Sequence, residues 1–211
     1  MKKALLFCVS MMVLPMISAQ ILVWEDFQGI FPPSGWTIEE AGWKLEPYAR
    51  AGGASPEAML QTSTPFGQDS GISDRTGNPR LISPVLDLTG ITQVVLEFNS
   101  FFISATGGTY GVATRTSTGP WNVVWQTTAG PSPVQQMLSG NFQIRIPVSN
   151  QNVNQPGFQF CFYYQQLSME ASNWYVDNIR LYQPLNHDVA AQSIPDTIDQ
   201  HQAGQLFAPF C

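Results

Sequence analysis

The 211-residue chain has little charge and few of the residues that catalytic sites use most often. Charged residues make up 11% of it, and its two histidines, His187 and His201, both stand near the C-terminal end. It contains no HExxH, GxSxG, P-loop or GxGxxG motif. These absences argue against metalloproteases, serine hydrolases and nucleotide-binding enzymes. We therefore predict a protein that is not an enzyme.

Basic residues are scarce as well. Nine lysines and arginines stand against 15 acidic residues, so the formal net charge is −6. A phosphate backbone needs clustered lysine and arginine, which excludes nucleic acid as a partner. The predicted strand faces carry no basic cluster either. This favours a neutral glycan or a protein over an acidic polysaccharide as ligand.

Long apolar runs are absent except at the N-terminus. Residues 1–19 combine Lys2 and Lys3 with an apolar stretch and a small-residue exit at Ser18-Ala19, which predicts a Sec signal peptide cleaved after Ala19. The apolar run is shorter than the ~20 residues that span a bilayer. We expect no membrane insertion and a secreted or cell-surface protein, whose mature net charge is −8 once both lysines are removed.

Two cysteines follow the predicted leader, Cys161 and Cys211. Cys161 lies between two phenylalanines in an apolar run, which indicates a buried free thiol, although a bridge to Cys211 stays open. The mature chain suits one domain of roughly 150–170 residues, which buries about 70% of its unfolded surface. Such a domain does not need a disulfide for stability.

Period-two alternation of apolar residues dominates the mature sequence, and no window of ten or more residues has helical spacing. The predicted strands are residues 80–90 (with a proline break), 94–104, 110–117, 121–126, 142–148, 157–165 and 173–182. Residues 49–80 are rich in glycine, serine, proline and aspartate and predict long loops. Strands this short and closely spaced predict an all-β fold, an antiparallel two-sheet β-sandwich.

Several motifs follow one another along the chain. They are WEDFQGIFPPSGW (24–36), Trp43, PRLISPVLDLTG (79–90), a strand pair closed by Trp125, and NWYVDNIRLY (173–182). In this order they resemble the cleaved-adhesin, or MAM-like, domain family of secreted bacterial proteins, which includes the haemagglutinin-adhesin domains of gingipain proteases. The resemblance covers residues 24–183. It implies jelly-roll topology, no catalytic activity and a structural calcium ion (Ca²⁺).

The family's calcium ligands can be carried over to this sequence. The opening glutamate falls on Glu25 and the strand carboxylate on Asp177, and the loop ligands correspond to Gly53 and Ser55. The loop departs from the family pattern, because proline and glutamate follow it. Calcium takes six to eight oxygen ligands, and two neighbouring acids repel unless a cation lies between them. The alternative for Asp177 is an acid paired with an arginine or with loop N–H groups.

Aromatic side chains are plentiful, and sugar-binding proteins stack sugar rings on them. Trp36 and Trp43 belong to the family pattern, and we expect both in the core. Tyr48, beside the long loops, and Trp121, at a turn, are therefore the candidate ligand-binding residues.

Three functions stay open. The leading one is a secreted, calcium-stabilised binding or adhesion module that recognises glycans or extracellular proteins at a cell surface. The second is an accessory domain of a larger secreted protease or surface protein, with no ligand of its own. The third is a jelly-roll glycosidase with Glu39 and Glu40 as its carboxylates, although a solvated strand end explains this pair too. Asp69, Asp74 and Asn78, in another loop, form a rival cation site whose spacing fits no EF-hand, and they are expected to be solvated.

The predicted domain organisation has three parts. Residues 1–19 are the signal peptide, residues 20–183 the jelly-roll sandwich, and residues 184–211 a linker followed by the first strand of a truncated second, Ig-like domain. The last segment is too short to build a core of its own. We therefore expect the chain to be part of a longer multidomain protein.

Overall fold

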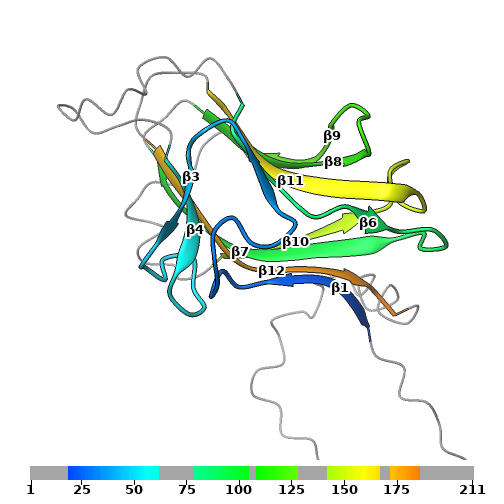
Figure 1. Cartoon of the computed structure of the whole chain (residues 1–211), viewed down its shortest axis with the longest axis horizontal. Helices are drawn as coiled ribbons and strands as arrows, with labels where there is room; N and C mark the ends of the chain where they lie inside the picture. Colours follow the sequence, from blue (N-terminus) through cyan, green and yellow to red (C-terminus); the bar gives the residue numbers. More distant parts are fainter. Residues whose placement is uncertain (1–18, 62–77, 105–107, 128–141, 167–171, 186–211) are drawn as a thin grey trace, which may run out of the picture. The chain divides into compact units, whose positions relative to one another are not determined.

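The computed structural model describes residues 19–61, 78–104, 108–127, 142–166 and 172–185. These residues form two antiparallel sheets packed as a jelly-roll β-sandwich, which confirms the predicted fold class (Figure 1). The described part of the chain contains no helix long and apolar enough to cross a membrane. The sandwich is the compact unit Gln20–Pro184. The predicted signal peptide and second-domain strand lie outside the described residues.

The first sheet has six strands in the order β10–β7–β12–β4–β3, and β1 also pairs with β12. Its strands are β1 (Gln20–Glu25), β3 (Trp43–Glu46), β4 (Glu57–Gln61), β7 (Val94–Ser104), β10 (Phe142–Val148) and β12 (Ser172–Gln183). Strand β12 pairs with β7 along one edge, and with β4 and then β1 along the other. The first and last strands of the domain are therefore neighbours.

The second sheet also has six strands, in the order β2–β5–β11–β8–β9, with β6 paired to β11. Its strands are β2 (Thr37–Glu39), β5 (Arg80–Ile82), β6 (Leu86–Asp87), β8 (Gly108–Thr116), β9 (Asn122–Thr127) and β11 (Pro156–Gln166). Strand β11 has the same central place here that β12 has in the first sheet. The proline break predicted within residues 80–90 separates β5 from β6.

Strand β4 corrects the prediction of a continuous loop over residues 49–80. Four consecutive residues of β4, Glu57 to Leu60, are buried. The strand pairs with β3 on one side and β12 on the other. Its five residues have no clear alternation, so these two neighbours rather than a local pattern place the segment in the sheet.

The core fills the space between the sheets and is rich in aromatic rings. Phe158, Phe160, Phe162 and Tyr164 of β11 face it, as their alternation predicts. Trp36 and Trp43 are each 5% exposed and belong to the same core, which confirms their expected place.

Trp174 of β12 lies among rings from both sheets of this core. Its indole lies 5.5–5.8 Å, between ring centroids, from Trp43, Phe102, Tyr110 and Phe162. Its Nε1–H donates a 2.9 Å hydrogen bond to the Ser100 hydroxyl, so the polar atom of the buried ring is satisfied. Strands of both sheets therefore meet around one side chain.

Cys161 confirms the predicted buried free thiol. It belongs to an apolar cluster on the outer face of the second sheet, with Ile82, Ala113 and Tyr163. Burial raises the pKa of the thiol to about 12, and the nearby positive charges of Arg80 and Arg115 offset this only in part.

We expect Cys161 to be unreactive in the folded protein, because the thiolate is the reacting species and burial suppresses it. In a chain carrying Cys8→Ser and Cys211→Ser, Ellman's reagent at pH 8 should label less than about one thiol in ten over an hour. Complete labelling should follow in guanidinium chloride. Rapid labelling without denaturant would contradict the burial of this strand.

Candidate functional site

A β-bulge in β12 determines where Asp177 points. Asp177 faces Asn99 across the sheet and Arg180 faces Glu97, so three steps along β12 match two along β7. Asn178, with φ of 51°, is the extra residue. The bulge resets the alternation, so Val176 and Ile179 on its two sides both face the core. Asp177 lies on the opposite face of the sheet, with Tyr175.

Asp177 is fully buried, and acidic residues surround it. Its Oδ1 accepts the N–H of Asn178 at 2.7 Å, whereas Oδ2 is buried without a hydrogen-bond partner. Burial raises the pKa of Asp177 to about 7, and the negative charges of Glu57, Asp26 and Glu25 add to the rise. The alternative was that an arginine or loop N–H groups pair with Asp177. Among the described residues, its hydrogen-bond partner is the N–H of Asn178.

The loop before β4 packs directly on this carboxylate. Gly53 has φ of 93°, and a Cβ there would lie 2.3 Å from Asp177 Oδ2 and 2.4 Å from Asn178 Nδ2. Only glycine therefore fits at this position. The structure places Gly53 next to Asp177, and Ser55 lies in the same loop; both Gly53 and Ser55 are exposed.

Glu57 holds the same loop closed and was missed from the sequence. Its carboxylate accepts the backbone N–H of Arg50 at 2.7 Å and that of Ala51 at 2.8 Å. Burial raises the pKa of Glu57 despite these two bonds. An acid placed directly after a Gly-Gly loop and before an apolar run was the available signal, since such loops need an acceptor for their N–H groups.

Glu25 lies at the end of β1, on the same side of the domain. Its Oε1 accepts the N–H of Phe27 at 2.7 Å, and burial raises its pKa. The structure thus brings Glu25, Asp177 and Gly53 into one region, which we call the acidic cluster together with Asp26 and Glu57. Within the described residues, no three Asp, Glu, His or Cys side chains are close enough to hold a metal ion by themselves. A cation here would also need backbone or amide oxygens.

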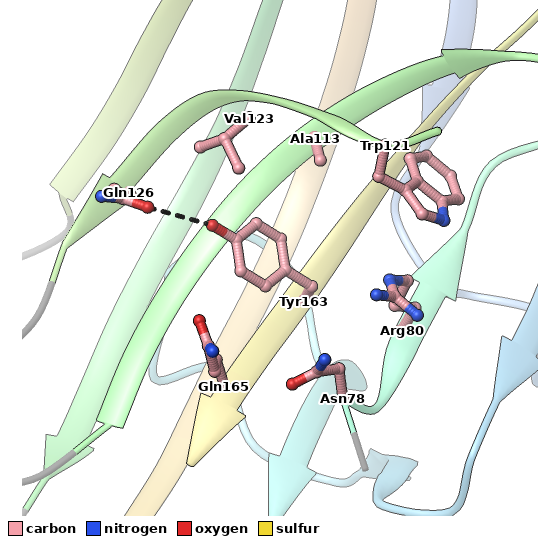
Figure 2. Close-up of a pocket in the computed structure, with 8 residues that line it drawn as sticks. All are labelled: Asn78, Arg80, Ala113, Trp121, Val123, Gln126, Tyr163 and Gln165. Atoms are coloured by element: carbon pink, nitrogen blue, oxygen red, sulfur yellow. Dashed lines mark hydrogen bonds between the residues drawn. The ribbon is translucent and has the colours of Figure 1, made fainter. Parts of the chain in front are cut away.

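A separate pocket of about 220 Å³ opens on the outer face of the second sheet (Figure 2). It is lined by Asn78, Arg80, Ala113, Trp121, Val123, Gln126, Tyr163 and Gln165. Tyr163 lies in the middle of this set, and its hydroxyl donates a 3.3 Å hydrogen bond to Gln126 (Figure 2). We call this the β11 pocket, because its central ring comes from β11.

The floor of the β11 pocket depends on a glycine. Gly111 of β8 is the cross-strand partner of Tyr163, and a Cβ there would lie 2.4 Å from the tyrosine ring. The ring can therefore extend over the neighbouring strand toward β9. A side chain at Gly111 would push it out of the pocket floor.

Trp121 forms part of the pocket wall, next to two arginines. The guanidinium carbon of Arg115 lies 4.3 Å from the indole centroid, and that of Arg80 lies 5.9 Å away. Trp121 is partly buried against the Cys161 cluster. It is therefore a fixed wall of the pocket rather than a freely exposed ring.

The other candidate residues lie elsewhere. Tyr48 is 48% exposed, but the guanidinium of Arg50 lies 5.0 Å from its ring centroid, and it does not line the β11 pocket. Glu39 forms a 2.9 Å ion pair with Arg80, and the adjacent Glu40 is exposed. Asp69 and Asp74 lie outside the described residues.

No protein-family model matches the chain, and no curated protein matches its sequence. Solved structures match its fold. A cleaved adhesin domain of Lys-gingipain from Porphyromonas gingivalis is 21% identical, with a TM-score of 0.53, over 77% of this chain and 98% of that domain. An exo-β-agarase is 13% identical, with a TM-score of 0.54, over 80% of this chain and 26% of its own, so this chain spans about a quarter of that protein. A family 11 carbohydrate-binding module of a Clostridium thermocellum cellulase is 15% identical, with a TM-score of 0.48, over 81% of this chain and 98% of the module.

The likeness to the cleaved adhesin domain of Lys-gingipain supports the resemblance at the level of the fold. The structural neighbours include cleaved adhesin domains and carbohydrate-binding modules.

Proposed function

We propose that the domain is a non-catalytic recognition module that binds a glycan in the β11 pocket. The observation that carries this proposal is the lining of the pocket, where an indole and a phenol adjoin the amides of Asn78, Gln126 and Gln165. Aromatic faces suit the C–H faces of sugar rings, and amides both donate to and accept from hydroxyl groups. The likeness to a domain named an adhesin accords with recognition rather than catalysis.

The size of the pocket limits what can bind there. At about 220 Å³ it is below the ~300–1,000 Å³ of typical drug-sized ligand sites. One sugar ring at a chain end or branch suits this volume better than an extended oligosaccharide does. The fixed positions of Trp121 and Tyr163 lower the entropy cost of binding.

We further propose that the chain is a member of the cleaved-adhesin family, that it is secreted or displayed at the cell surface, and that it is part of a longer multidomain protein. The apolar leader of residues 1–19 supports secretion, and the strand motif that follows the sandwich supports further domains.

We also propose a structural calcium ion at the acidic cluster. Three observations support it. Oδ2 of Asp177 is buried without a hydrogen-bond partner, and Gly53, which has no side chain, lies directly beside it. The negative charges of the surrounding acids also repel that of Asp177. Asp177 and Glu25 would supply carboxylate oxygens, and the loop from Gly53 to Ser55 further oxygens. The ion would supply positive charge that holds this loop and β1 against β12.

Binding at the β11 pocket can be tested by substitution. Trp121→Ala should weaken glycan binding at least about tenfold, or ~1.4 kcal/mol, because it removes one wall of the pocket. An oligosaccharide array identifies the ligand, and isothermal titration then measures the affinity of wild type and variant.

Trp24→Ala is the matched control for this test. Trp24, on the other sheet, is 44% exposed, and the guanidinium of Arg180 lies 4.4 Å from its ring, so it reproduces the tryptophan–arginine contact outside the pocket. Its affinity should equal that of the wild type. If no glycan binds a folded protein, the accessory-domain function replaces this proposal.

A further inference from the structure

Two arginines from different strands meet at the indole ring of Trp121. Arg80 lines the β11 pocket together with this ring, and Arg115 contacts the ring without lining the pocket itself. Arg80 lies on β5 and Arg115 on β8, which flank β11 on its two sides. The guanidinium carbon of Arg115 lies 4.3 Å from the Trp121 centroid and that of Arg80 lies 5.9 Å from it. This meeting could not be predicted from the sequence, because the two arginines are far apart in the chain, and the sequence favoured a neutral ligand.

The charge of the two arginines is only half balanced. Arg80 pairs with Glu39, whose side chain is 49% exposed. Arg115 donates from Nε and Nη2 to the neutral amide oxygen of Gln159, at 3.1 and 3.0 Å, and has no carboxylate partner among the described residues. The same two arginines and Glu39 are the charged side chains that act on the pKa of the neighbouring Cys161. Among the residues that the structure describes, one positive charge is thus left over at this face of a chain whose net charge is −6.

Arg115 is held in place before any ligand arrives. Its guanidinium stacks on Trp121 and is bound by Gln159, which is only 9% exposed. A planar guanidinium forms paired hydrogen bonds with a carboxylate, and little side-chain entropy is then lost on binding. The amides of the pocket remain for the hydroxyl groups of the same sugar.

We propose that the sugar bound in the β11 pocket is an acidic one, whose carboxylate is held by the guanidinium groups of Arg115 and Arg80 beside Trp121. This inference rests on the proposed glycan-binding function and adds the class of sugar. A single unbalanced positive charge matches one carboxylate, such as that of a hexuronate residue. Lysine would not replace Arg115 fully, because it offers a point charge in place of a planar fork.

A matched pair of ligands separates this inference from the function on which it rests. The probes are hexuronate oligosaccharides and the same oligosaccharides with their carboxyl groups reduced to primary alcohols. The wild type should bind the carboxylated form at least about tenfold more tightly. This preference should shrink as salt is raised from about 0.05 to 0.5 M, since the site is partly exposed.

Substitutions then show which arginine binds the carboxylate. Arg115→Gln should reduce the affinity for the carboxylated form to that for the reduced form, and Arg115→Lys should give an intermediate value. Arg180→Gln is the matched control, because Arg180 stacks on Trp24 at 4.4 Å on the other sheet. It should leave the preference unchanged. Circular dichroism and the unfolding midpoint of each variant show whether it is folded.

The outcomes are distinguishable. If the wild type binds both forms equally and Trp121→Ala abolishes both, the glycan-binding function stands and the acidic-sugar inference is overturned. Binding of sulfated but not carboxylated oligosaccharides would overturn the assignment of a carboxylate. A preference that survives in Arg115→Gln and in Arg80→Gln would also overturn it. Failure of every oligosaccharide to bind the folded wild type would remove both proposals.

Discussion

Trp174→Ala is expected to lower the free energy of unfolding by about 3–5 kcal/mol, the range measured when a buried aromatic ring is truncated. The indole contacts four other rings from both sheets and satisfies its N–H at Ser100. Its removal leaves a cavity at the centre of the core and a hydroxyl without its donor. Urea unfolding followed by circular dichroism measures the change.

Trp24→Ala provides the matched control, since it removes the same side chain from the surface of the first sheet. It should cost less than about 1 kcal/mol. Trp174→Phe should fall between the two, because it keeps most of the apolar volume and loses the bond to Ser100. A loss below about 1 kcal/mol for Trp174→Ala would contradict the packing around this residue.

Removal of calcium is expected to have the second large effect. EDTA should lower the unfolding midpoint of the wild type, and calcium at about 100 times its dissociation constant should add ~2.7 kcal/mol of stability. In Asp177→Asn the response to EDTA should vanish, because the carboxylate that faces the proposed ion is gone. In EDTA at pH 8 this variant should be more stable than the wild type, since a buried, unpaired charge has been removed.

The pH dependence of the calcium-free protein has a definite sign. The pKa of Asp177 is about 7 in the folded protein against an ordinary 3.8, so between these values the folded state holds a proton that the unfolded state has released. Stability in EDTA should therefore fall as pH rises from 4 to 7, by at most ~1.4 kcal/mol per pH unit for this group. The raised pKa values of Glu25 and Glu57 act in the same direction.

Asp177→Asn should flatten this dependence. Thermal unfolding between pH 4 and pH 8, in EDTA and in calcium, measures it for both chains. If EDTA leaves the wild-type midpoint unchanged at pH 8, no calcium is bound and Asp177 is a strained structural acid. If the wild type in EDTA is instead most stable at high pH, the burial described for this carboxyl is wrong.

The sandwich could be predicted because most of its strands carry their own pattern. Residues 142–148 alternate so regularly that the predicted and observed ends of β10 coincide. The two faces of β11 were separated correctly for the same reason. Strand β4 was missed because four of its five residues are buried in succession without alternation, and its place depends on β12, which lies far from it in the sequence.

The candidate sites were less predictable, because they depend on which strands become neighbours. Glu25 and Asp177 could be paired in advance through the family motif and the adjacency of the first and last strands. Glu57 could not, because its role follows from the loop N–H groups that it binds. The meeting of Arg80 and Arg115 at Trp121 depends on the order β5–β11–β8–β9, which no local pattern contains.

The central place of β12 has a consequence for when the domain can fold during its synthesis. The strand at the middle of the first sheet is also the last to be synthesised, and it pairs with β1, the first. Until β12 is available, β1 has no partner strand, β4 can pair only with β3, and the aromatic core lacks Trp174. The nascent chain therefore stays open while it is being made, and it folds late and over long sequence separations, in the slow regime of such β-topologies. Such a delay would suit the secretion that we propose, because a secreted chain crosses the translocon before it folds.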